Sequence, residues 1–185
     1  MRARINIENI TGIKQFDISA NITEHGAGGI TFKNSISDFE SVVTANLFDN
    51  HKTRISHEID SKYIYLTLKS EKGEFEIDID LLTGKITSMT CNPGYNGKLL
   101  NEIGIGSKMS ELIKADDTIG FDLDHDFYVR YPFDGLIIYP PSDLAPKIFN
   151  ATIAEESIPD FKIETIEIVN MEFAKKLFKG TLYFE

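Results

Sequence analysis

Phe75-Glu-Ile-Asp-Ile-Asp-Leu81 alternates apolar and acidic residues without a break, and this stretch decides the fold. Strict alternation places one face of a strand in the core and the other in water, which is typical of an antiparallel sheet. The preceding segment, 62–68, alternates in the same way, and Thr83-Gly84 turns the chain into a further short strand over 85–90. The sequence therefore predicts a three-stranded meander.

Short helices and further strands are expected on both sides of this meander. Ser37 with Glu40 has the form of a capping box, and Ser107 is the expected cap of a second helix. The predicted helices span 37–48, 108–114 and the segment from Asn170 to Gly180. Apolar residues at strand spacing predict the other strands at 5–10, 16–22, 30–32, 119–123, 127–131, 136–139, 161–169 and 181–184. The predicted fold class is α+β, a mostly antiparallel sheet built of meanders with two or three short helices.

The length of 185 residues fits a single domain, 1–185. A helix followed by three strands occurs twice, after Ser37 and after Ser107, although the two sequences do not align. We therefore keep open two similar lobes, 1–92 and 98–185, packed as one body.

Composition limits the kind of partner. The 29 Asp and Glu residues outnumber the 19 Lys and Arg residues, and no stretch supplies the basic patch that nucleic acids require. A net charge of -10 favours a basic protein partner. Cys91 is the only cysteine, the first residues lack the apolar core of a secretory signal, and no apolar run approaches a membrane span of about 20 residues. We expect a cytoplasmic protein that binds neither nucleic acid nor membrane.

The densest concentration of one chemistry is an acidic cluster of Asp116, Asp117, Asp122, Asp124 and Asp126. The segment from Asp122 imitates the opening of a calcium loop, but Phe127 stands where the loop needs Gly and Phe133 where it needs Glu. We expect a hairpin instead, with Phe121 and Leu123 pointing inward and 124–126 at the tip.

No motif assigns a catalytic residue. His57-Glu58 lacks the second histidine of a zincin helix, and Gly104-Ile-Gly106 lacks the third glycine of a dinucleotide loop. Cys91 has no base signalled nearby and is expected to fill space in the core. The tyrosines at 63, 65 and 128 are expected to be buried by a second layer or to belong to an interface. We expect no cofactor and no metal ion.

One resemblance adds to this interpretation. Four motifs carry it: Ile77-Asp-Ile-Asp-Leu-Leu-Thr-Gly-Lys-Ile86, Gly94-Tyr-Asn-Gly-Lys98, Ile103-Gly-Ile-Gly-Ser107 with its short helix, and Gly135-Leu-Ile-Ile138. With these motifs, residues 75–140 resemble immunity proteins of bacterial polymorphic toxin and contact-dependent growth inhibition systems. It implies a cytoplasmic protein that binds and blocks one toxin domain, often a nuclease, and it assigns no individual residues.

The functional hypothesis is a non-enzymatic acidic protein that neutralises a basic toxin domain by direct binding. The expected binding surface consists of Asp116, Asp117, Asp122, Asp124, Asp126 and Asp134. The alternative is a small metal-dependent hydrolase that uses Asp122, Asp124, His125 and Asp126. A ligand-binding module on the tyrosine-bearing sheet face is a third hypothesis, and the oligomeric state stays open.

Overall fold

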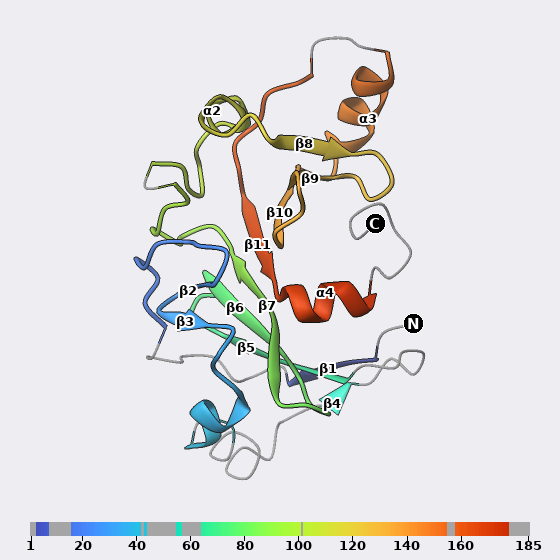
Figure 1. Ribbon diagram of the computed structural model, residues 1–185. Coiled ribbons are helices and arrows are strands. Elements are labelled where there is room, and N and C mark those ends of the chain that lie inside the picture. The colour runs from blue at the N-terminus through green and yellow to red at the C-terminus, as the bar shows by residue number, and fades with distance from the viewer. Residues whose placement is uncertain are drawn as a thin grey trace.

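The computed structural model describes residues 3–7, 16–41, 43, 55–56, 64–100, 102–154 and 158–177, with backbone only for 3–7, 55–56, 64–65, 153 and 176–177. The central feature is a nine-stranded sheet in the order β4-β1-β5-β6-β7-β11-β10-β9-β8 (Figure 1). Its strands are β1 (Ala3–Ile7), β4 (Ile55–Ser56), β5 (Ile64–Lys69), β6 (Phe75–Asp80), β7 (Lys85–Cys91), β8 (Ile119–Asp122), β9 (Phe127–Arg130), β10 (Leu136–Tyr139) and β11 (Thr165–Val169). From β5 to β8 every neighbouring pair is antiparallel, whereas β1 runs parallel to β5.

The predicted α+β class is therefore confirmed, and the β5–β6–β7 meander lies where the alternating sequence placed it. Two similar lobes are not seen. Met89 of β7 is paired with Ile168 of β11, so that one sheet runs without interruption from the first half of the chain into the second.

The helices are η1 (Ile36–Phe39), α2 (Met109–Ala115), α3 (Ala145–Ile153) and α4 (Met171–Leu177). The N-cap residue of η1 is Ser35 instead of the expected Ser37, and that of α2 is Lys108 instead of Ser107. The backbone N–H of Ser35, not of Ser37, donates to Asp38 Oδ2 at 2.8 Å, and the Ser107 hydroxyl accepts from the N–H of Gly104 instead of capping α2. Of the predicted helix over 37–48, residues 42 and 44–48 lie outside the described residues. The predicted strand 181–184 also lies outside them.

Helix α3 was not predicted, because Pro140-Pro141 suggested that regular structure stops there. Pro146 instead lies in the first turn of α3, where a missing N–H costs nothing. Buried Ile148 then anchors the helix to the core.

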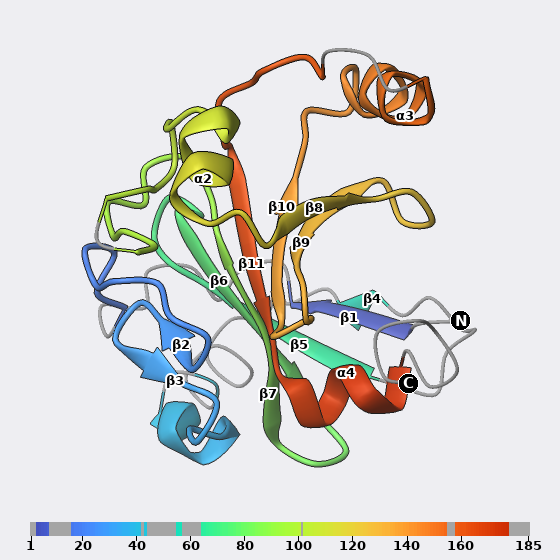
Figure 2. The same ribbon diagram turned by 45° about the horizontal axis from the view of Figure 1, so that its top comes forward.

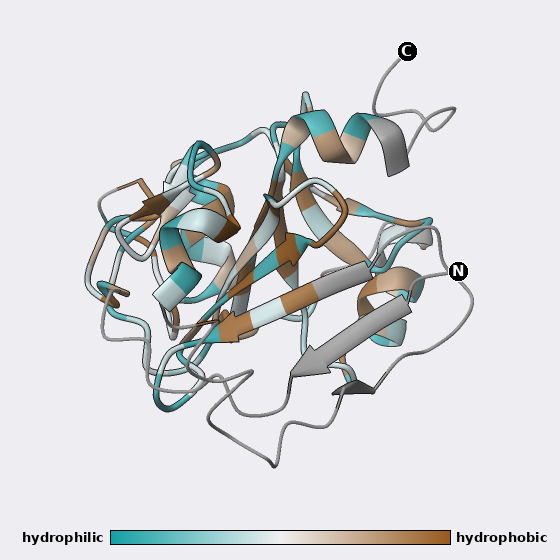
Figure 3. Ribbon diagram, turned by 90° about the horizontal axis from the view of Figure 1, so that it is seen from below, coloured by the Kyte–Doolittle hydropathy of each residue, from teal (hydrophilic) through white to brown (hydrophobic). Residues whose placement is uncertain are grey.

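The two faces of the sheet are buried to different extents. On one face β5, β6, β7 and β11 contribute the main core, which is covered by the segment 16–43, α2 and α3. On the other face a smaller cluster of Phe127, Val129, Phe133, Ile137 and Val169 packs against Ala174 of α4. Successive residues of β9, β10 and β11 therefore belong to different clusters. On β6 the second face is polar, and hydrophobic and hydrophilic residues alternate along the strands (Figure 3).

The strand predicted over 16–22 is formed only as an isolated bridge, Ile22 to Leu99. Backbone hydrogen bonds join Ile18 and Ile22 to the loop 96–98, and a tyrosine adds a second attachment. The Tyr95 hydroxyl donates to the carbonyl of Ala20 at 2.6 Å and accepts from the N–H of Gly28 at 2.7 Å. This clamp fixes the small hairpin of β2 (Gly26–Ala27) and β3 (Ile30–Thr31) beside β7 (Figure 2).

Candidate functional site

The acidic cluster lies around the hairpin of β8 and β9, at the end of the sheet. Asp122 and Phe127 form the last pair of the ladder, and the N–H of Asp126 donates to the carbonyl of Asp122 at 3.0 Å. Asp126 has a φ of 58°, a left-handed conformation that aspartate tolerates better than most residues. The predicted hairpin is confirmed. Leu123 was expected to point inward but is 41% exposed, because the chain already turns at this residue.

Asp122 shapes the turn from within. Its side chain is buried, Oδ1 accepts from the N–H of Asp124 at 2.8 Å, and Oδ2 lies 3.0 Å from Nδ1 of His125. The His125 ring stacks on Phe127 with centroids 5.5 Å apart. An aspartate that bonds the backbone two residues later is a standard way to fix a turn, so Asp122 holds the tip in place.

Arg130 joins two more of the predicted site residues. Its Nε donates to Asp116 Oδ2 at 2.7 Å, and its Nη1 donates to Asp134 Oδ2. Burial opposes the charge of Arg130, but the hydrogen bonds that it donates to Asp134 and Asp116 outweigh this effect and raise the pKa of the guanidinium. Burial also acts to raise the pKa of Asp116, yet hydrogen bonds from Thr118 and Arg130 outweigh it and lower that pKa. This triad connects the end of α2 to β9 and to the turn before β10.

The other predicted aspartates, Asp117, Asp124 and Asp126, are exposed. Two apolar residues beside them are exposed as well, Leu123 at 41% and Tyr131 at 46%. Burial, followed by the charges of Asp122 and Asp124, raises the pKa of the Tyr131 phenol. The N–H of Tyr131 donates to the carbonyl of Thr118, next to Asp117. We call Asp117, Leu123, Asp124, Asp126 and Tyr131 together the β8–β9 surface.

The described part of the chain contains no group of three or more His, Cys, Asp or Glu side chains arranged to hold a metal ion. The segment 122–126 belongs to that part of the chain. Cys91 is fully buried in the core, as expected for a space-filling residue. Burial raises the pKa of its thiol to about 12, which keeps it protonated at neutral pH. The predicted burial of Tyr128 is also observed, whereas the side chains of the tyrosines at 63 and 65 lie outside the described ones.

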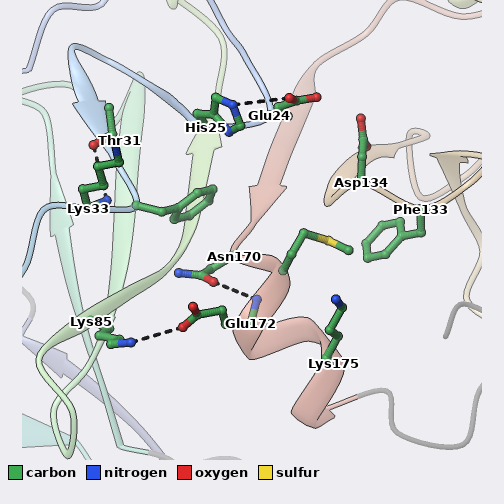
Figure 4. A pocket seen from close by; sticks show the side chains of 12 residues that line it. Glu24, His25, Thr31, Lys33, Lys85, Phe133, Asp134, Asn170, Glu172 and Lys175 are labelled. Carbon is green, nitrogen blue, oxygen red and sulfur yellow. Dashed lines mark hydrogen bonds and ion pairs between the residues drawn. The ribbon is translucent and has the colours of Figure 1, made fainter.

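Sequence reasoning missed a cleft of about 990 Å³ (Figure 4). Its walls come from the β2–β3 hairpin, the start of β7, the turn before β10, and α4. Asn170 positions α4 there, because its side chain accepts from the N–H of Glu172 at 3.0 Å and donates to the carbonyl of Ile86 at 3.1 Å. These four segments are far apart in the sequence, and the pairings of β11 with β7 and with β10 bring three of them together, while the hairpin contacts β7 through β2.

Among the described residues, no helix has the length and the apolar character needed to cross a membrane. Comparison of the chain with protein-family models, with curated proteins and with solved structures gives no match.

Proposed function

We propose that this chain is a non-enzymatic binding protein that neutralises a basic toxin domain by direct contact, as immunity proteins do. The β8–β9 surface is the contact region in this proposal. The observation that carries it is the composition of that surface, in which three aspartates are exposed along the same hairpin as exposed Leu123 and Tyr131. Protein interfaces combine apolar or aromatic residues with polar ones, and tyrosine is enriched among the residues that dominate binding energy.

Charge supports the same proposal. With a net charge of -10, the chain attracts a basic partner over several ångströms and increases its association rate. The three other predicted aspartates have internal tasks: Asp122 holds the turn, and Asp116 and Asp134 bind Arg130. They position the β8–β9 surface, and the direct contacts with lysine and arginine side chains fall to Asp117, Asp124 and Asp126.

The test uses the product of the reading frame beside this gene, which the proposal expects to contain a basic toxin domain. Co-expression is expected to restore growth of cells that produce the toxin domain, and titration calorimetry of the purified pair is expected to show an affinity that falls with added salt. Reversing two charges with Asp124→Lys and Asp126→Lys should weaken the affinity at least about tenfold, since like charges then face each other.

The matched control reverses the charge of Glu71 and Glu102, two exposed residues outside the β8–β9 surface. This double variant has the same net charge as the first and should bind within about threefold of the original chain. Equal losses in both variants would reject the β8–β9 surface as the contact region. Absence of both binding and growth protection would reject the function itself.

A further inference from the structure

The cleft between the β2–β3 hairpin and α4 combines apolar and basic side chains, and it meets the acidic hairpin only at Asp134. Its volume of about 990 Å³ lies at the upper end of the range of about 300–1,000 Å³ that small-molecule sites occupy. Three apolar side chains line it: Phe133 is buried, while Phe32 and Met171 are half-buried. Each comes from a different wall, so that a ligand in the cleft would have apolar contacts on several sides.

The acidic side chains that line the cleft each have a cationic or histidine neighbour. Lys85 Nζ lies 3.1 Å from Glu172 Oε2, His25 Nε2 lies 3.4 Å from Glu24 Oε1, and Asp134 binds Arg130. Lys33 and Lys175 differ, since neither forms an ion pair with another residue that the structure describes. Lys33 lies on the hairpin wall and Lys175 on α4, where its amine points toward Phe133 (Figure 4).

We propose that this cleft binds a small organic anion, whose apolar body packs against Phe32, Phe133 and Met171 and whose anionic group faces one of two lysines on opposite walls, Lys33 or Lys175 (Figure 4). A carboxylate, sulfonate or phosphate suits either amine, because lysine recognises anions as a compact charge rather than by a fixed geometry. In a chain with a net charge of -10, two lysines that form no ion pair with a described residue, beside three buried or half-buried apolar side chains, distinguish this cleft from the acidic surface. The inference does not depend on the proposed toxin partner.

A pair of fluorescent probes tests this assignment. Anilinonaphthalene sulfonate carries an anionic group on an apolar body, and phenylnaphthylamine has the same body without the sulfonate. The sulfonate probe should bind the full chain saturably and at least about tenfold more tightly than the neutral probe. The double variant Lys33→Gln with Lys175→Gln should abolish that difference while the neutral probe keeps its affinity.

The matched control is Lys147→Gln with Lys162→Gln, two exposed lysines on other elements, and it should leave both affinities within about twofold. Phe133→Leu should weaken both probes equally, since it removes apolar contact and no charge. The assignment fails if the two probes bind the original chain with equal affinity, or if the cleft variant and the control variant behave alike. The two double lysine variants replace exposed side chains, and unchanged thermal unfolding verifies that each of them is folded.

Discussion

The ring of Tyr131 lies against Gly120: a Cβ atom added to Gly120 would come within 2.9 Å of Tyr131 Cε2. Gly120 is in the edge strand β8, and Tyr131 follows the last residue of β9. The missing side chain of Gly120 therefore makes room for the ring. The ring of Tyr131, which is 46% exposed, packs into this space and is ordered by the contact. A preordered aromatic side chain loses less conformational entropy on binding.

Gly120→Ala is expected to displace Tyr131 without unfolding the protein. A Cβ at this position strains the contact with the ring, but alanine also removes the backbone entropy cost of glycine, so the free energy of unfolding should change by less than about 1 kcal/mol. Affinity for the toxin domain should fall several-fold. Calorimetry and urea unfolding measure the two effects separately.

The control for this prediction is a double-mutant cycle with Tyr131→Ala. If Gly120 acts only through the ring, adding Gly120→Ala to Tyr131→Ala should have no further effect on affinity. Additive losses would show that Gly120 contributes in another way.

Replacing Arg130 with Met should destabilise the fold by about 2 kcal/mol, because Asp116 and Asp134 then lose a partly buried partner. Urea unfolding measures the loss. Lys85→Met is the comparison, since Lys85 and Glu172 are 63% and 75% exposed, and it should cost less than about 0.5 kcal/mol. Equal effects of the two replacements would contradict the structural role of Arg130.

Acid should weaken the fold partly through Asp116. Its pKa in the folded state is lowered below the ordinary value of 3.8, so its stabilising contribution is present above that value and is lost as the pH falls through the folded pKa. Urea midpoints measured from neutral pH downward should therefore fall below about pH 4. Asp116→Asn should lower stability at neutral pH and reduce this acid dependence, and an unchanged slope would contradict the assignment.

Tyr128 and Tyr95 should respond in opposite ways to the loss of their hydroxyl groups. Tyr128 is 1% exposed, and its hydroxyl has no hydrogen-bond partner in the described part of the chain. Burial, followed by the nearby charge of Asp160, raises the pKa of this phenol to about 12. Tyr128→Phe removes a buried polar group that gains little from burial, so it should be neutral or should stabilise by up to about 1 kcal/mol.

Tyr95→Phe is the matched change in a bonded tyrosine. It leaves the carbonyl of Ala20 and the N–H of Gly28 without their partner and should cost about 1–3 kcal/mol. Thermal unfolding compares the two variants directly. A loss at Tyr128 as large as that at Tyr95 would reveal a hydrogen bond to the Tyr128 hydroxyl.

Local pattern was sufficient for much of the sheet and insufficient for the site. Alternation over 75–81 identified β6, and the acidic tip between Phe121 and Phe127 identified the β8–β9 hairpin. Alternation could not show that the strand stops at Asp122, which is why the orientation of Leu123 was wrong. Helix α3 was missed because Pro140-Pro141 before it suggested an end of regular structure, and Pro146 in its first turn concealed its start.

The internal tasks of the aspartates could not be predicted from spacing. Arg130 is 14 residues from Asp116 and four from Asp134, and only the fold of the hairpin brings both carboxylates to one guanidinium. The available signal in the sequence was Arg130 itself, a single arginine among many aspartates, which indicates an ion pair with some of them. The cleft gave no such signal, because the pairing of β7 with β11 is what places α4 beside the start of β7, and these parts of the chain are distant in sequence.

That pairing also sets the order of events during synthesis. Met89 and Ile168, which are paired in β7 and β11, lie about eighty positions apart. At a translation rate of about 5–20 residues per second, the completed β5–β6–β7 meander waits on the order of ten seconds for its next strand. Throughout this interval β7 is an open edge able to pair with another nascent chain. Rare codons between 92 and 164 should therefore lower the yield of monomeric protein, even though they change no residue.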